Sequence, residues 1–270
     1  MDRRLLAPAE AALLLAPKAG TAAECVQAGL LSLLSSGRIG FDRSRSIFKE
    51  SALLLHPGAD ADAAPLPGHL QALDDALRGY AEGGIRLKAG EVLHALQRRF
   101  GHGFAGFVHD QIAPGLIRRG LLVRRDTKVL RIFPRIVYER TPAGEALTGP
   151  LKRLMAAVDA VPSLIDRDPD QALRLARSAG VPLVMSPRAR RKIPKLRKLL
   201  AARDGDPAAI AFEPIENERE AEWQQVVELG DMALAFDVAA LFDGLDAAAD
   251  FTSDGGGSSG DGDGGGGGGD

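Results

Sequence analysis

The sequence is nearly devoid of cysteine and poor in aromatic residues. Cys25 is the single cysteine among 270 residues, so no internal disulfide can form and no oxidising compartment is required. We expect Cys25 to be a small buried hydrophobe. The aromatic residues are 10 Phe, 2 Tyr and 1 Trp, whereas Ala, Leu and Arg are abundant. Because this composition favours helices over strands, we expect a mainly α protein.

Long apolar runs are also missing. No uninterrupted apolar stretch reaches the ~18 residues that a membrane-spanning helix needs. The chain begins like a signal peptide, but Pro8, Glu10 and Pro17 interrupt its first apolar run. We therefore expect a soluble, cytoplasmic protein that reaches a membrane only by docking on its surface.

Recognisable catalytic and metal-binding patterns are absent too. None of the five histidines has a partner three or four residues away on a helix, as a metal site would require. We interpret Asp74 and Asp75, and the trio Asp166, Asp168 and Asp170, as helix-start or capping acids. No base lies near Cys25 in the sequence. We expect no catalytic residue, metal or cofactor, and hence no enzyme.

Charge is divided unevenly along the chain. Residues 213–270 hold 15 of the 36 acids and one of the 34 bases, whereas residues 1–212 hold 21 acids and 33 bases. A basic body with an acidic C-terminal segment indicates a polyanionic partner, or an internal screen for one.

Apolar spacing predicts helices interrupted by two short hairpins. Predicted helices span residues 8–15, 22–36, 69–80, 89–100, 107–119, 143–161, 169–179, 188–203 and 216–245. Predicted strands at 39–41 and 52–55 follow the second helix, and strands at 121–125 and 131–138 follow the fifth. We predict that Asp126, Thr127 and Lys128 form the turn of the second hairpin. Both units have the order helix, glycine, hairpin.

These elements predict a single helical domain over residues 1–250. It contains two helix–hairpin, winged-helix-like units and a protruding β-hairpin. Residues 251–270 are rich in Gly, Asp and Ser, which cannot bury enough apolar area to offset the entropy of ordering. We expect this tail to be disordered.

Two groups of cations are denser than an ordinary solvated surface. The first brackets the second hairpin and consists of Arg118, Arg119, Arg124, Arg125, Lys128, Arg131, Arg135 and Arg140. The second consists of Arg188, Arg190, Arg191, Lys192, Lys195, Arg197 and Lys198. Apolar residues accompany the first group, a combination that suits an anionic membrane interface. The second group could bind phosphate groups on lipid or nucleic acid. The alternative is that both are ordinary solvated arginines and lysines.

Several segments resemble the Golgi phosphoprotein 3 family. They are AGLLSLLSSGRI at residues 28–39, LDDAL at 73–77, LIRRGLL at 116–122, VLRIFPR at 129–135 and DPDQAL at 168–173. The resemblance covers about residues 5 to 200. It implies one mainly helical domain whose protruding hairpin binds phosphatidylinositol 4-phosphate at membranes. In eukaryotic members that binding retains glycosyltransferases in the Golgi.

The resemblance carries over the hairpin but not the family's lipid headgroup pocket. The pocket's tryptophan falls near Pro17, and its arginines fall on Val26, Gly106 and His109. The apolar membrane-inserting tip, in contrast, corresponds to Ile132 and Phe133.

We therefore expect a non-enzymatic peripheral membrane adaptor that binds an anionic lipid, with a phosphoinositide as the suspected lipid and a protein client as a further partner. The expected headgroup-binding residues are Arg124, Arg125, Lys128, Arg131 and Arg135. The expected membrane-inserting residues are Leu130, Ile132 and Phe133. The alternative is a winged-helix regulator that binds DNA or another protein. A third interpretation is a cytoplasmic domain like those of bacterial membrane proteins with glycine-rich tails.

Overall fold

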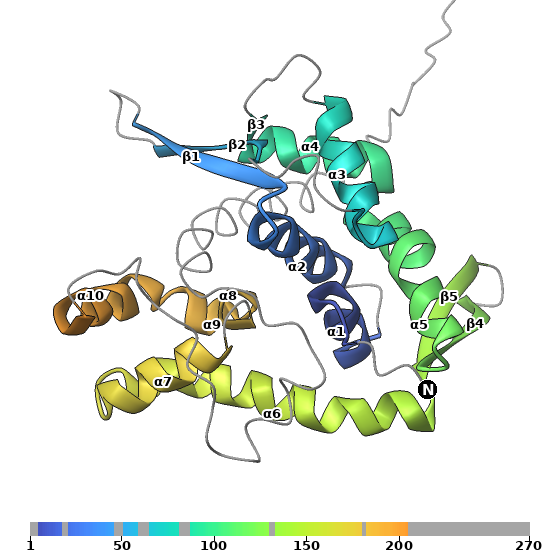
Figure 1. The fold of residues 1–270 in the computed structure, drawn as a ribbon. Helices are drawn as coiled ribbons and strands as arrows, with labels where there is room; N and C mark the ends of the chain where they lie inside the picture. Colours follow the sequence, from blue (N-terminus) through green and yellow to red (C-terminus); the bar gives the residue numbers. More distant parts are fainter. Residues whose placement is uncertain are drawn as a thin grey trace, which may run out of the picture.

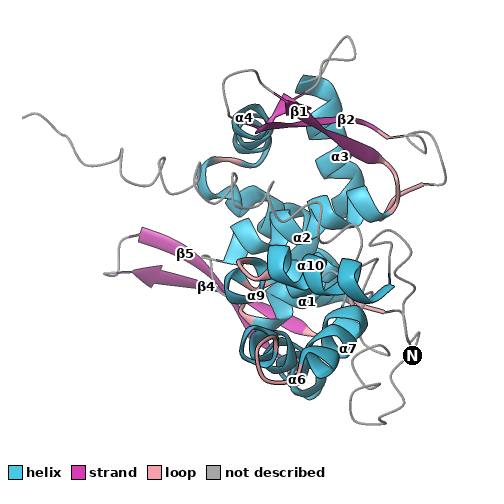
Figure 2. Cartoon of the chain, turned by 90° about the vertical axis from the view of Figure 1, so that its left-hand side faces the viewer, coloured by secondary structure: helices cyan, strands magenta, loops and turns pink. Residues whose placement is uncertain are grey.

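The computed structural model describes residues 5–17, 21–45, 51–58, 65–80, 87–129, 133–179 and 182–204. Over these residues the protein is mainly helical, as the composition predicts, with two small antiparallel sheets beside the helices (Figures 1 and 2). The helix predicted at residues 216–245 and the tail of residues 251–270 lie outside the described part of the chain.

Helices α1 (Pro8–Leu15) and α2 (Ala22–Ser35) occupy the centre of the fold (Figure 1). Proline suits the first position of α1 because its missing N–H needs no partner there. The Glu10 carboxylate accepts a hydrogen bond from the amide of Ala7 (3.0 Å), which satisfies one of the free amides at the start of α1. Most of α2 is buried, including Cys25, and this confirms the expectation for the single thiol.

Two helical segments end in the same way, at Gly37 and Gly120. These glycines have φ angles of +67° and +68°, a left-handed conformation that glycine adopts without a Cβ clash. After Gly37, the amide of Arg38 donates to the carbonyl of Leu33 (3.0 Å). After Gly120, the amide of Leu121 donates to the carbonyl of Leu116 (2.9 Å). This hydrogen-bond pattern is the Schellman motif, which ends a helix and redirects the chain.

A hairpin follows each of these glycines, as predicted. The strands are β1 (Ile39–Arg45) with β2 (Ser51–Pro57), and β4 (Leu122–Val129) with β5 (Phe133–Arg140). The short strand β3 (Leu87–Lys88) pairs with β2 on the side away from β1. One backbone hydrogen bond closes the base of each hairpin, from Gly58 to the Arg38 carbonyl (2.9 Å) and from Thr141 to the Leu121 carbonyl (3.1 Å). The repeated order of the two units is therefore present in the structure.

The second hairpin is longer than predicted. In the β4–β5 register, Asp126 pairs with Ile136 and Lys128 pairs with Pro134, so residues 126–128 belong to a strand. The prediction of a turn at Asp126, Thr127 and Lys128 is therefore wrong. Asp126 can occupy a strand position because it lies two residues after Arg124 on the same face of β4. Its carboxylate accepts a hydrogen bond from the Arg124 guanidinium (3.1 Å). The link between the strands falls at residues 130–132, outside the described residues.

Helices cover α1 and α2 from two sides (Figure 1). On one side lie α3 (Gly68–Tyr80), α4 (Ala89–Phe100), the short η2 (His102–Phe104), the π-helical η3 (Phe107–Ile112) and α5 (Ala113–Arg118). On the other lie α6 (Pro142–Leu164), α7 (Pro169–Ala179), α8 (Pro182–Met185), α9 (Pro187–Arg190) and α10 (Ile193–Asp204). The helix predicted at residues 107–119 is thus divided just before Pro114, whose ring and missing N–H disrupt regular α-helical bonding.

One hydrophobic core joins these helices. Its fully buried side chains come from α1, α2, α3, α4, η3 and α5, and it continues into α6 and α7. Phe107 is central, with no exposed surface and with its ring centroid 5.1 Å from that of Phe100. The continuity of this core supports a single structural unit over the described helices.

Candidate functional site

The β4–β5 hairpin projects from the helical body and is the candidate site predicted from the sequence (Figure 2). Its base is fixed to the core by Leu122 and Tyr138, which are 1% and 6% exposed. The Tyr138 hydroxyl lies 2.8 Å from Nδ1 of His109 on η3. The base of the hairpin is therefore held by packing and by a polar contact, while its outer part is exposed.

The polar contact at the base has unusual electrostatics. Burial lowers the pKa of His109 from its ordinary value, opposed by the negative charge of Asp110 and reinforced by the positive charge of Arg124. Burial also raises the pKa of Tyr138, against the opposing effect of Arg124. Both groups are therefore held in their neutral forms, in which the Tyr138 hydroxyl can donate to the unprotonated His109 nitrogen.

Stability is expected to fall on acidification because of His109. The pKa of His109 is lower in the folded state than in the unfolded chain, so the unfolded chain binds a proton more readily. The unfolded state is therefore stabilised relative to the folded state as the pH drops through about 6.5, the ordinary pKa of histidine. We expect His109→Gln to reduce the slope of unfolding free energy against pH between about 7 and 5. Urea midpoints measure this, with His102→Gln at an exposed position as the control. An unchanged slope in His109→Gln contradicts the prediction.

Two of the four hairpin arginines that were predicted to bind headgroups are engaged with acids of the same hairpin. Arg124 forms an ion pair with Asp126 (3.0 Å), and Arg125 forms one with Glu139 (2.7 Å). All four side chains are substantially exposed, so each pair contributes at most about 1 kcal/mol and can be exchanged for another anion. Counting cations along the sequence therefore overstates the positive charge of this surface.

Two further arginines of the same group support the fold. Arg119 forms an ion pair with Glu10 of α1 (3.1 Å). Arg140 donates to the carbonyl of Leu14 (2.6 Å) and to the carbonyl of Leu15, at the end of α1. These carbonyls have no partner within the helix, so the guanidinium caps α1 and fixes the base of the hairpin to it.

The outer part of the hairpin carries an exposed cation, whereas the exposed apolar side chain lies near the base, one position from the Leu122–Arg140 pair. Lys128 is exposed and forms no ion pair with any other residue that the structure describes. Val123 is 45% exposed, which is high for a large apolar side chain. Phe133 and Arg135 lie on β5, opposite Val129 and Thr127 in the register. The predicted tip residues Leu130, Arg131 and Ile132 lie outside the described residues.

The carboxylates interpreted as capping acids behave in different ways. Asp168 accepts a hydrogen bond from the amide of Gln171 (3.0 Å) at the start of α7, which confirms the interpretation for this residue. Asp74, in contrast, lies in the middle of α3, is 2% exposed and forms an ion pair with Arg78 (2.9 Å). The capping interpretation of Asp74 is therefore wrong, because the i, i+4 arginine allows a carboxylate inside the helix.

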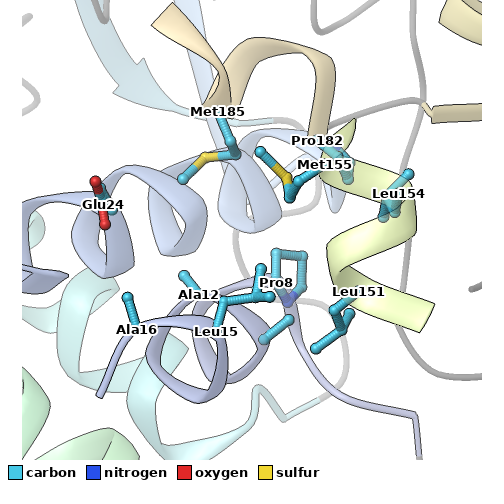
Figure 3. A pocket seen from close by; sticks show the side chains of 11 residues that line it. Pro8, Ala12, Leu15, Ala16, Glu24, Leu151, Leu154, Met155, Pro182 and Met185 are labelled. Atoms are coloured by element: carbon cyan, nitrogen blue, oxygen red, sulfur yellow. The ribbon is translucent and has the colours of Figure 1, made fainter. Parts of the chain in front are cut away.

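An apolar cavity lies elsewhere, between α1, α2, α6 and α8 (Figure 3). It has a volume of about 160 Å³ and is lined mainly by apolar side chains, including Leu15, Met155 and Met185. Glu24 contributes a carboxylate at its edge. This cavity could not be predicted from local sequence patterns, because its walls combine the first two helices with residues 151–185.

Neither a metal centre nor a membrane span is evident in the described part of the chain. Within it, no three His, Cys, Asp or Glu side chains are grouped to hold a metal ion. None of the helices there combines the length and the apolar character needed to cross a bilayer. No protein-family model matches the chain, and no curated protein sequence is significantly similar to it. The similarity to the Golgi phosphoprotein 3 family therefore remains a prediction from the motifs.

Proposed function

We propose that the protein is a non-enzymatic peripheral adaptor, acting in the cytoplasm, that binds anionic membrane lipid through the β4–β5 hairpin. The observation that carries the proposal is the projection of this hairpin from the helical body (Figure 2). Strand β4 is exposed from Val123 to Lys128 and carries the cations Arg124, Arg125 and Lys128. A projecting element with both apolar and cationic side chains can enter the headgroup region while the helices remain in water.

The arrangement of charges supports reversible binding. Lys128 is exposed, and the weak pairs of Arg124 and Arg125 can be exchanged for lipid phosphates at little cost. Each cation near an anionic surface contributes about 1 kcal/mol, and burial of an apolar side chain adds about 1.5–3 kcal/mol. A phosphoinositide, with its additional phosphate, would gain more from these cations than a lipid of single charge. The protein client of such an adaptor would bind the helical body.

Co-sedimentation with anionic vesicles tests the proposal. We expect Phe133→Ala to weaken binding about tenfold at any salt concentration, because the loss is apolar. We expect Lys128→Gln to weaken it by about fivefold at low salt only. The control is Arg174→Gln, which removes one exposed cation from α7 and should leave binding unchanged. Vesicles with and without phosphatidylinositol 4-phosphate measure the lipid preference.

The repeated helix–glycine–hairpin unit supports a second candidate, a winged-helix protein that binds DNA through the β4–β5 wing. Against it, the segment before the wing buries Phe107, Ile112 and Leu116 and exposes Asp110, so it offers few groups to read bases. DNA binding through a wing would depend on Lys128 but hardly on Phe133. Failure to sediment with anionic vesicles at low salt, together with binding to duplex DNA, would replace the membrane proposal with this one.

A further inference from the structure

A second cationic surface surrounds a cavity at the opposite end of α6 from the hairpin. This cavity, of about 340 Å³, is lined by Pro162 and Ser163 near the end of α6 and by Arg188, Arg191 and Lys192 around the α9–α10 turn. We call it the α6–α10 cavity. Since Pro162 lies 20 residues after the start of α6 at Pro142, about 30 Å of helix separates the cavity from the base of the hairpin. It is therefore a separate site from the proposed membrane interface.

The backbone that carries these cations is fixed by buried neighbours. Ala189, Ile193 and Leu196 are all at most 2% exposed and pack into the core. The Ser186 hydroxyl donates to Asp159 of α6 (2.6 Å) and accepts from the amide of Ala189 (3.2 Å), which ties α9 to α6. The backbone that carries the cationic side chains is therefore a rigid support, so a ligand would have to order mainly the exposed side chains themselves.

The two acids that flank Pro162 and Ser163 in the sequence are already engaged. Asp159 accepts from Ser186, and Asp166 forms an ion pair with Lys195. The hydrogen bond and charge of Lys195 hold the pKa of Asp166 below its ordinary value, with a smaller contribution from Lys192. Within the described residues, Arg188 and Arg191 form no ion pair. Three positive side chains thus surround one cavity, where their mutual repulsion favours the entry of an anion.

We propose that the α6–α10 cavity binds a phosphate group, carried by a phosphorylated small molecule or by a lipid headgroup. Guanidinium groups bind phosphate oxygens in a bidentate manner, and a phosphate dianion can neutralise two of the three cations. The cavity volume is at the lower end of the ~300–1,000 Å³ of small-molecule pockets. This size fits one compact ligand better than a length of nucleic acid. The proposal stands independently of the hairpin and goes beyond its function.

Calorimetric titration of the full chain with inositol 1,4-bisphosphate at low salt tests this site. We expect Arg188→Gln/Arg191→Gln to lower the affinity at least tenfold, because each substitution removes a charge-assisted hydrogen bond. Lys192→Gln provides an independent variant with a smaller loss. The control is Arg98→Gln/Arg99→Gln on α4, which makes the same change in net charge at exposed positions and should alter the affinity less than twofold.

The source of the phosphate is distinguished by repeating the comparison with vesicles that contain phosphatidylinositol 4-phosphate. Loss of vesicle binding in the cavity variant indicates a lipid headgroup, whereas loss of inositol bisphosphate binding alone indicates a soluble ligand. Two results overturn the proposal. One is an equal loss in the α4 control, which shows diffuse charge attraction. The other is absence of inositol bisphosphate binding by the intact protein, including the case where duplex DNA binds at these residues instead.

Discussion

Replacing Phe107 with alanine is expected to lower the free energy of unfolding by about 3–5 kcal/mol. The side chain is completely buried, packs against Phe100 and reaches α2 beside Gly29. Its removal loses apolar burial and leaves a cavity that rigid neighbouring helices cannot fill. Equilibrium urea unfolding measures the change.

A control for this substitution lies only ten residues away. Ile117 is 36% exposed on α5, so Ile117→Ala should change the free energy of unfolding much less than Phe107→Ala does. Small domains have a total free energy of unfolding of about 5–15 kcal/mol, so Phe107→Ala could remove most of the stability of the protein. A loss below about 1 kcal/mol would contradict the central position that the structure gives to this ring.

The second large effect is expected at Gly144, in the first turn of α6. A Cβ atom at this position would lie 2.1 Å from the backbone oxygen of Leu121 and 3.3 Å from Cδ1 of Leu14. Since a backbone oxygen cannot move aside as a flexible side chain can, Gly144→Ala must displace α6 from the helix–hairpin junction. We expect a loss of about 1–3 kcal/mol or more, measured by urea unfolding.

Gly79, near the end of α3, supplies the control. A Cβ atom there would meet nothing within 4 Å, and the next residue is Tyr80 rather than a proline. Alanine is a better helix former than glycine, so Gly79→Ala should raise the free energy of unfolding by up to about 1 kcal/mol. The two substitutions are chemically identical and are expected to have opposite signs. Equal effects would show that the close approach of α6 to Leu121 is wrong.

Local signals in the sequence were sufficient to predict most of the helices and the residues at which they begin and end. Gly37 and Gly120 end helical segments because glycine adopts the left-handed conformation that a Schellman motif requires. Pro8 begins α1 for a comparably local reason, since its fixed φ angle suits the first helical position. Such features depend on neighbours within about five residues, and these are visible in the sequence.

The candidate site was less predictable, because its geometry depends on residues far apart in the chain. Arg140 caps the carbonyls of Leu14 and Leu15, and Arg119 binds Glu10, over separations of more than 100 residues. Counting cations near the hairpin could not reveal that these two arginines support the helices. The strand register was equally hidden, since a polar trio at residues 126–128 has the composition of a turn and yet lies within β4.

The closure of each hairpin at its base fixes where its two strands join the helical body. Because the bonds from Gly58 to Arg38 and from Thr141 to Leu121 fix where each hairpin leaves and rejoins the helices, a change of tip length or composition leaves the junction with the core intact. Under the proposed function, binding preference can thus diversify through substitutions or insertions at the tip without a matching compensation in the core.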